Sequence, residues 1–83
     1  MEYRVYLLRC ADGSFYTGIT TDLVRRVAEH NGSGKGAAYT RARRPVVLVY
    51  AEPAESRSAA QKREYELRTL PRAKKLLLAK EWA

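Results

Sequence analysis

The sequence predicts an α+β fold in which a small three-stranded antiparallel sheet is flanked by about three helices, in the order β-β-α-β-α-α. Three observations support this prediction. Two short apolar runs surround Asp12-Gly13, a β-branched run follows Pro45, and apolar residues recur at helical spacing in the remaining segments. A chain of 83 residues is long enough for one core, so we expect residues 1–83 to form a single domain.

The first two strands are predicted at about 3–10 and 14–20, joined by a turn at Asp12-Gly13. A two-residue loop would place Tyr6 and Tyr16 on opposite faces of the sheet, because side chains alternate along a strand. A three-residue loop with Gly13 in the left-handed conformation instead pairs Tyr6 with Gly18, and both rings then share one face. We favour this second register. Gly18 would leave open space before Tyr6, which suits a ligand backbone or a packed helix equally well.

A helix is predicted from about Leu23 to His30, because Thr20-Thr21-Asp22 supplies N-cap candidates and an apolar stripe follows. Arg26 and His30 stand one turn apart beside that stripe. Arg26 is therefore a candidate phosphate ligand, and a side chain stretched over the sheet edge is the alternative. His30 also suits a simple cap at the helix end.

Residues 31–38 predict a glycine-rich loop. It is not a Walker-type phosphate loop, because its lysine is not followed by Ser or Thr and no buried strand precedes it. Residues 39–44 (Y-T-R-A-R-R) combine an aromatic ring, a hydroxyl and three guanidiniums, which suits contact with a nucleic-acid backbone. A solvated basic turn is the alternative. The candidate nucleic-acid contacts are Arg26, Lys35, Tyr39, Thr40, Arg41, Arg43 and Arg44.

The third strand is predicted at 46–50, interior to the sheet or covered on both faces, and is followed by a loop over 51–57. The spacing Ser58-x-x-Gln61 predicts a capping box at the start of a second helix. Ala60, Glu64 and Leu67 then share the face toward the sheet. A carboxylate in that row requires a partner, either a metal ion or a salt bridge to Arg26 or Arg63, and spacing alone favours the salt bridge.

Pro71 should end the second helix and open a third that reaches about Trp82. Its leucines at 76–78 and Trp82 are expected to close one end of the core.

The net charge of +7 and the pI of about 9.9 indicate a polyanionic partner, with nucleic acid as the leading candidate and a merely solubilising surface as the alternative. No apolar run approaches about 18 residues and no signal-peptide pattern is present, so we expect a cytoplasmic protein without membrane association. The single Cys10 excludes an internal disulfide, and one histidine excludes a Cys/His metal site. A monomer is the default expectation.

The two tyrosines and Gly18 resemble the paired motif of the GIY-YIG nuclease superfamily. Arg4-Val5-Tyr6 stands where G-I-Y is usual, and Tyr16-Thr17-Gly18 stands where Y-I-G is usual. The run T-D-L-V-R-R-V-A-E-H and the segment Q-K-R-E at Glu64 follow in the family's order and approximate spacing. The resemblance covers nearly the whole chain and is nearest to the small stand-alone, single-domain members.

This resemblance implies a divalent-metal-dependent endonuclease, a hydrolase of DNA phosphodiester bonds with repair or recombination of branched or damaged DNA as its expected setting. Glu64 would bind Mg²⁺ or Mn²⁺ as the only cofactor, and Arg26 would contact the scissile phosphate. Tyr6, Tyr16 and His30 would orient or deprotonate the attacking water, and which of them is the base stays open. A non-catalytic nucleic-acid-binding module and a basic protein-interaction domain are the alternative functions.

Overall fold

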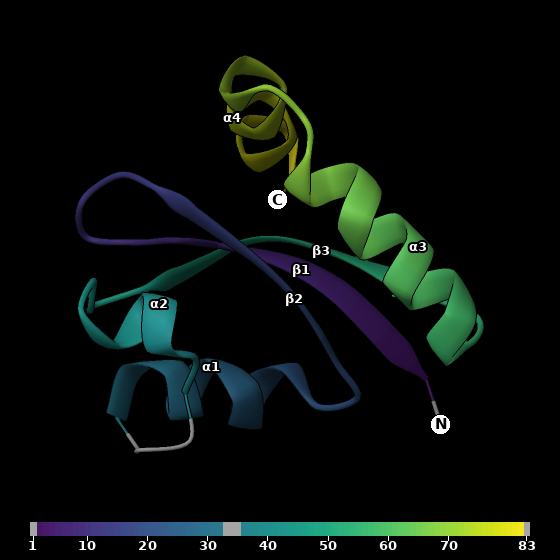
Figure 1. Cartoon of the computed structure of the whole chain (residues 1–83), viewed down its shortest axis with the longest axis horizontal. Coiled ribbons are helices and arrows are strands. Elements are labelled where there is room, and N and C mark those ends of the chain that lie inside the picture. Colours follow the sequence, from purple (N-terminus) through teal and green to yellow (C-terminus); the bar gives the residue numbers. More distant parts are fainter. Residues whose placement is uncertain (1, 33–35, 83) are drawn as a thin grey trace.

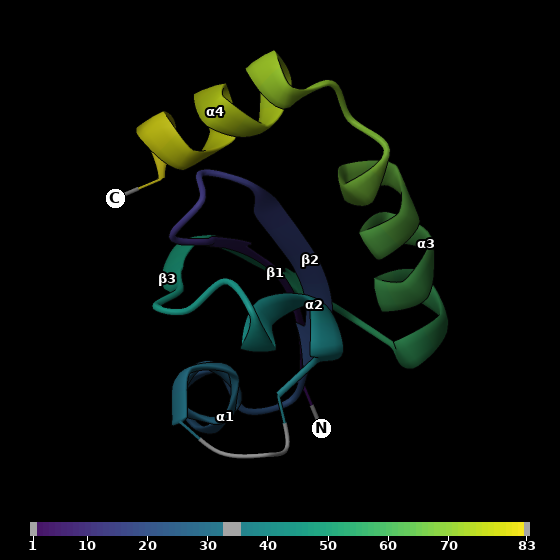
Figure 2. The same cartoon turned by 60° about the vertical axis from the view of Figure 1, so that its left-hand side comes forward.

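A computed structural model of the chain describes residues 2–32 and 36–82, and it contains a three-stranded antiparallel sheet between helices (Figure 1). The helices and strands of this part are β1 (Tyr3–Arg9), β2 (Phe15–Thr20), α1 (Leu23–Gly32), α2 (Ala38–Arg41), β3 (Val47–Ala54), α3 (Arg57–Arg68) and α4 (Arg72–Glu81). The strand order is β2-β1-β3, so β1 is central. Helices α1 and α2 lie on one side of the sheet, and α3 and α4 lie on the other (Figure 2). The predicted fold class is confirmed, with the one-turn helix α2 as an addition.

The hairpin of β1 and β2 forms the three-residue loop that the sequence favours. Tyr6 lies opposite Gly18 and Leu8 lies opposite Tyr16. The Cys10 amide donates to the Ser14 carbonyl at 2.8 Å, and Gly13 has a φ of 84°, the left-handed conformation that glycine adopts without strain. The register therefore places both tyrosine rings on the same face of the sheet, as predicted.

Each face of the sheet has its own apolar core, because the strands carry apolar side chains on both sides. The core on the side of α1 is built from Tyr6, Leu8, Cys10 and Val46. The core on the side of α3 is built from Val5, Ala60 and Leu67. The core on the α1 side contains Tyr6, so a residue predicted for the active site also belongs to the apolar core.

The third strand is longer than predicted and is not interior. It continues through Pro53 to Ala54, where the sequence predicted a loop. Proline lacks the amide hydrogen needed by a strand paired on both sides, but β3 is an edge strand and tolerates it. Val47 is 59% exposed, so the expectation of a strand covered on both faces was wrong.

The helix α3 begins two residues earlier than the predicted capping box places it. Ser56 is its N-cap and accepts a hydrogen bond from the Ala59 amide at 3.0 Å, so the prediction of Ser58 as the cap was wrong. Ser56 has the extended backbone that an N-cap requires, whereas Ser58 lies within the helix.

Pro71 separates α3 from α4, as predicted. The leucines of α4 do not close the core as a group. Leu78 packs against the cluster on the α3 side, but Leu76, Leu77 and Trp82 are 38%, 49% and 38% exposed. None of the helices in the described segments has the length and apolar character needed to cross a membrane.

Candidate active site

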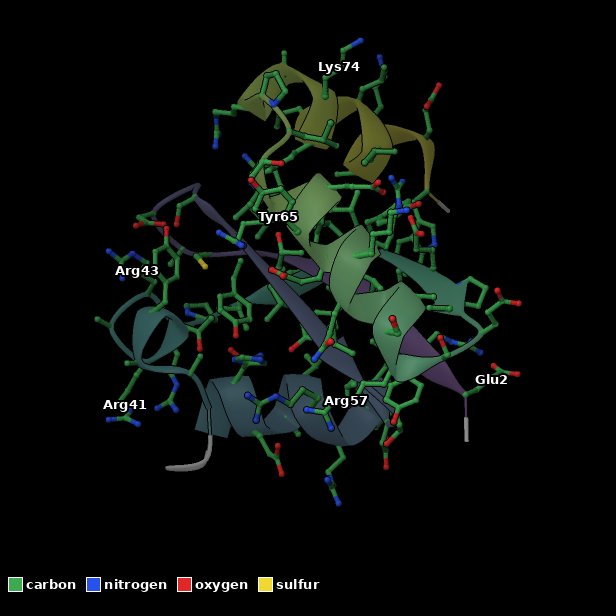
Figure 3. The ribbon with its side chains drawn as sticks, turned by 45° about the vertical axis from the view of Figure 1, so that its right-hand side comes forward. Glu2, Arg41, Arg43, Arg57, Tyr65 and Lys74 are labelled. Atoms are coloured by element: carbon green, nitrogen blue, oxygen red, sulfur yellow. The ribbon has the colours of Figure 1, made fainter. Side chains whose placement is uncertain are left out.

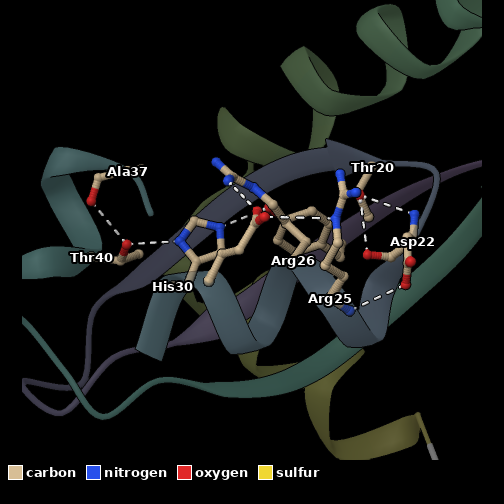
Figure 4. A network of polar contacts seen from close by, with 9 residues as sticks. Thr20, Asp22, Arg25, Arg26, His30, Ala37 and Thr40 are labelled. Atoms are coloured by element: carbon tan, nitrogen blue, oxygen red, sulfur yellow. Dashed lines mark hydrogen bonds and ion pairs between the residues drawn. The ribbon is translucent and has the colours of Figure 1, made fainter. Parts of the chain in front are cut away.

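A buried line of hydrogen bonds connects β1, α1 and α2 on one side of the sheet. The Tyr6 hydroxyl lies 2.9 Å from His30 Nε2, and His30 Nδ1 lies 2.7 Å from Thr40 Oγ1. The Thr40 hydroxyl donates to the Ala37 carbonyl at 3.0 Å. Figure 4 shows this line running from His30 through Thr40 to Ala37. Tyr6, His30 and Thr40 are each at most 1% exposed.

The direction of these bonds follows from the number of protons available. A threonine hydroxyl has one proton, and Thr40 gives it to the Ala37 carbonyl. Thr40 Oγ1 must therefore accept from His30, which assigns the proton of the neutral ring to Nδ1. His30 Nε2 is left with its lone pair and accepts from the Tyr6 hydroxyl. We call this line of hydrogen bonds the relay. Within it, the Tyr6 phenol is the donor and the His30 imidazole is the acceptor.

The pKa values of the two groups agree with this direction. Burial lowers the pKa of His30, and the cations Arg26 and Arg44 lower it further against the opposing charge of Glu29. The imidazole is therefore neutral near pH 7. Burial raises the pKa of Tyr6 to about 12, so the phenol keeps its proton at neutral pH. Of these two groups, the imidazole is the one able to accept a proton.

The second motif tyrosine lies beside this pair. The centroid of the Tyr16 ring is 6.5 Å from that of Tyr6 and 5.0 Å from that of His30. The ring of Tyr39, from α2, stacks on Tyr16 with centroids 6.1 Å apart. Three elements thus deliver aromatic rings to one place, and His30 joins the two tyrosines that the hairpin brings together.

Gly18 is the residue that makes room for Tyr6. A Cβ atom at Gly18 would lie less than 3.0 Å from three atoms of the Tyr6 side chain, its hydroxyl oxygen included. The space before Gly18 is therefore filled by the phenol of the neighbouring strand. Neither of the two expected occupants, a ligand backbone or a packed helix, takes it.

Arg26 lies on α1 at the border of this group. Asp22 directly precedes the helix, and its carboxylate accepts from the Arg25 amide at 3.1 Å. In the next turn Arg26 reaches Glu29 Oε1 at 3.0 Å. Burial acts against the charge of Arg26, but its bonds to Glu29 and Tyr6 outweigh this and raise its pKa. The guanidinium is 27% exposed at its side chain, so it remains in contact with solvent beside the Tyr6 hydroxyl.

Glu64 lies on α3, between Ala60 and Leu67 on the row that packs toward the sheet. Its side chain is 21% exposed and its Oε2 accepts from Arg68 Nε at 3.0 Å. The expected salt bridge therefore forms, but the predicted partners were wrong. Arg63 instead pairs with Glu52 and Glu66, and the cation four residues after Glu64 is the one in reach.

The donor set decides which kind of metal ion these residues fit. No group of three or more His, Cys, Asp or Glu side chains converges within residues 2–32 and 36–82. Mg²⁺ is often held by one or two carboxylates, with water and substrate phosphate as the other ligands. The partly exposed carboxylate of Glu64 fits that arrangement, which Mn²⁺ shares, and it would have to release or share Arg68.

The basic segment 39–44 is tied to the protein more closely than predicted. Thr40 is fully buried against His30, so its predicted contact with nucleic acid was wrong. Arg43 donates to Asp12 Oδ2 at 3.1 Å and lies over the Tyr39 ring at 3.9 Å. Arg44 donates to the His30 carbonyl at 2.7 Å.

The remaining candidates for nucleic-acid contact differ in accessibility. Arg41 is exposed, and Figure 3 shows it extending away from the body of the protein beneath α2. Tyr39 is 38% exposed. Lys35 lies outside the described residues.

Two polar residues of this region make contacts that the sequence did not predict. Thr40 holds His30 from a position ten residues away, beyond any helical repeat. The Asn31 side chain both donates to the Val46 carbonyl, at 2.9 Å, and accepts from the Val46 amide, at 2.7 Å. Asn31 therefore connects the end of α1 to the start of β3 by two hydrogen bonds. No local sequence pattern predicts this contact between distant segments.

Comparison with known proteins extends these observations. Residues 2–76 match the family model described as the GIY-YIG catalytic domain. The UPF0213 protein DP2720 of Desulfotalea psychrophila is 57% identical over 76 residues, which cover 92% of this chain and 69% of that protein. The UPF0213 protein SH2523 of Staphylococcus haemolyticus is 51% identical over 80 residues, 96% of each chain.

Two solution NMR structures resemble the fold. The UPF0213 protein BH0048 from Bacillus halodurans is 49% identical, with a TM-score of 0.58 over 96% of this chain and 84% of that one. The protein EF2693 from E. faecalis is 44% identical, with a TM-score of 0.61 over 90% of this chain and 79% of that one.

Proposed function

This chain belongs to the GIY-YIG family, and from that premise we propose that it is a divalent-metal-dependent endonuclease acting on DNA phosphodiester bonds. The observation that carries the proposal is the buried relay from the motif tyrosine Tyr6 to His30, with the ring of Tyr16 beside both. A neutral imidazole held in one tautomer next to a phenol is suited to moving a proton at neutral pH.

In the proposed reaction, Tyr6 accepts a proton from the attacking water as it passes its own proton to His30 Nε2. The resulting imidazolium keeps its Nδ1 proton on Thr40, so the ring does not have to turn. Tyr16 positions the water from the same face of the sheet. Arg26, beside the Tyr6 hydroxyl, offsets the negative charge that develops on the phosphate oxygens.

We assign the metal ion, Mg²⁺ or Mn²⁺, to Glu64. When bound, such an ion supplies positive charge to the phosphate and to the leaving oxygen. The net charge of +7 supports a DNA substrate, because cations neutralise phosphates without regard to sequence. Repair or recombination of branched or damaged DNA is the setting we propose.

A non-catalytic DNA-binding module is the second candidate. It is favoured by one observation, the pairing of the Glu64 carboxylate with Arg68, which places a guanidinium where the metal ion would act. Such a module would keep the basic surface and make no use of the relay.

Cleavage of supercoiled, single-stranded and branched DNA with Mg²⁺ or Mn²⁺ separates the two candidates. For a nuclease, Glu64→Gln should abolish cleavage and retain DNA binding, because it removes one charge and keeps the shape of the side chain. Glu66→Gln is the matched control on the same helix and should cleave as the original protein does. If the original protein leaves all three DNA forms intact at several salt concentrations, the nuclease assignment is wrong and the binding module stands.

A further inference from the structure

A hollow lies along the outer edge of β2, beside the candidate active site. Its volume is about 290 Å³, and it is lined by Phe15, Tyr16, Thr17, Tyr39, Arg68 and Lys75. These residues come from β2, α2, the end of α3 and α4, four elements that meet around this edge (Figure 2). No strand of the described segments pairs with the outer edge of β2, so the hollow opens to solvent there.

The walls of this hollow are aromatic. Tyr16 and Tyr39 are stacked with an interplanar angle of 30°, and Phe15 adds a third ring. The Phe15 ring already has a planar cation over it, since the Arg72 guanidinium lies 5.3 Å from its centroid. Rings of this kind are the surfaces on which single-stranded nucleic acids stack their bases.

The remaining border of the hollow is cationic. The side chain of Arg68 is 56% exposed. Lys75 donates one hydrogen bond from Nζ to the Arg68 carbonyl at 2.9 Å, and an ammonium group has three donors. Burial lowers the pKa of Lys75, and the charge of Arg68 lowers it further. The Glu64 carboxylate accepts from Arg68 Nε at 3.0 Å, and an anion on the Lys75 side of Arg68 would relieve the repulsion between the two cations.

We propose that this hollow binds one unpaired nucleotide of a DNA strand, with its base against the Phe15 ring and its phosphate on Arg68 and Lys75. A base inside a duplex is stacked and paired, so it offers no face to a ring until it leaves the stack. The inference rests on the proposed function, because Tyr16 lines both the hollow and the active site and would place this nucleotide beside the scissile phosphate.

The test uses a single-stranded oligonucleotide that contains the fluorescent base 2-aminopurine, in metal-free buffer. The protein should quench the fluorescence, because stacking on an aromatic ring does so. Phe15→Leu keeps an apolar side chain of similar size and removes the ring. Because stacking on an aromatic ring contributes to the affinity for each base, Phe15→Leu should lose the quenching and weaken binding about tenfold.

Lys75→Gln tests the phosphate contact, and Lys74→Gln is its matched control. Lys74 is the neighbouring lysine of α4, is exposed, and points away from the sheet in Figure 3. Removing one phosphate contact should reduce the slope of log affinity against log salt by about 0.7 for a single strand. We expect this reduction for Lys75→Gln and not for Lys74→Gln. Equal slopes for the two variants would overturn the proposal.

Two further outcomes would also overturn it. One is quenching that Phe15→Leu leaves unchanged while circular dichroism shows a folded protein. The other is displacement of the oligonucleotide by a free mononucleotide at similar concentration, which would assign the hollow to a small nucleotide. The assay requires no cleavage. Quenching without cleavage would contradict the proposed nuclease activity and support the nucleotide site. Cleavage without quenching would support the nuclease activity and contradict the nucleotide site.

Discussion

Gly18 is the position at which a single methyl group decides whether Tyr6 can reach its partner. The Gly18→Ala variant would press its Cβ against the Tyr6 phenol, so the ring must shift or the hairpin must open. We expect this overpacking to cost about 1–3 kcal/mol of the free energy of unfolding, measured by urea denaturation. The shift should also break the bond from the Tyr6 hydroxyl to His30.

Gly32→Ala is the control for that substitution. A Cβ atom at Gly32 meets no atom within 4 Å, and the residue ends a helix, so its replacement should leave the stability nearly unchanged. Equal losses of stability for the two variants would show that Tyr6 does not occupy the space before Gly18.

Thr40 is the positioning residue of the proposed proton relay. Thr40→Val keeps the shape of the side chain but removes the acceptor of the His30 Nδ1 proton. Leaving a buried donor unsatisfied costs about 1–3 kcal/mol, so we expect DNA cleavage to fall about tenfold. The pH profile of cleavage should shift as well, because the tautomer of His30 is no longer set.

Thr40→Ser restores the hydroxyl and should restore both the rate and the pH profile. Thr21→Val changes an exposed threonine in the same way and should leave both unchanged. A Thr40→Val variant that loses stability but keeps the pH profile would mean that Thr40 only supports the fold.

The start of α3 offers a direct comparison between two serines. Ser56→Ala removes the side-chain acceptor of the Ala59 amide and should lower the free energy of unfolding by about 1 kcal/mol. Ser58→Ala changes a residue inside the first turn, where alanine is the better helix former, and should cost nothing. Thermal or urea denaturation measures both, and the opposite ranking would place the cap at Ser58.

The short helix α2 contributes two residues to the candidate active site. It carries Thr40 to His30 and Tyr39 to Tyr16, so one turn of helix supplies both the buried relay and the exposed ring stack. The segment that follows is fastened to the hairpin turn, since the Ala11 amide donates to the Arg43 carbonyl at 2.9 Å and Arg43 reaches Asp12. The turn thereby helps to position α2 over the strands that bear the tyrosines.

The stability of the whole molecule should depend on pH through His30. Its pKa is lowered in the folded state by burial and by Arg26 and Arg44, with Glu29 acting in the opposite direction. As the pH falls, the His30 imidazole of the unfolded chain therefore takes up its proton first, around the ordinary histidine pKa of about 6.5. The free energy of unfolding should accordingly be constant just above that pH and fall as the pH drops through it.

Urea denaturation at several pH values between about 5 and about 7.5 measures this effect, because most carboxylates titrate lower. His30→Gln removes the ionisable group, so its stability, although lower, should vary less over this range. A steeper fall in the variant than in the original protein would contradict a buried neutral imidazole.

Several features of this protein could be predicted because their causes are local. The alternation of apolar residues and the Asp12-Gly13 turn indicated the register that brings Tyr6 and Tyr16 to one face. The residues Thr20-Thr21-Asp22 located the start of α1, and Pro71 located the break before α4. A turn, a helix start and a helix break each depend on a few neighbouring residues, so the amino-acid sequence alone is sufficient to locate them.

Other features were decided only when distant segments packed together. The extension of β3 through Pro53 depends on its being an edge strand, and the partner of Glu64 depends on which cation the α3 surface presents. Thr40 was predicted to face nucleic acid and instead holds His30. The polar partners of a buried side chain are whatever groups the neighbouring elements bring within about 3 Å, and that proximity is a property of the assembled layers.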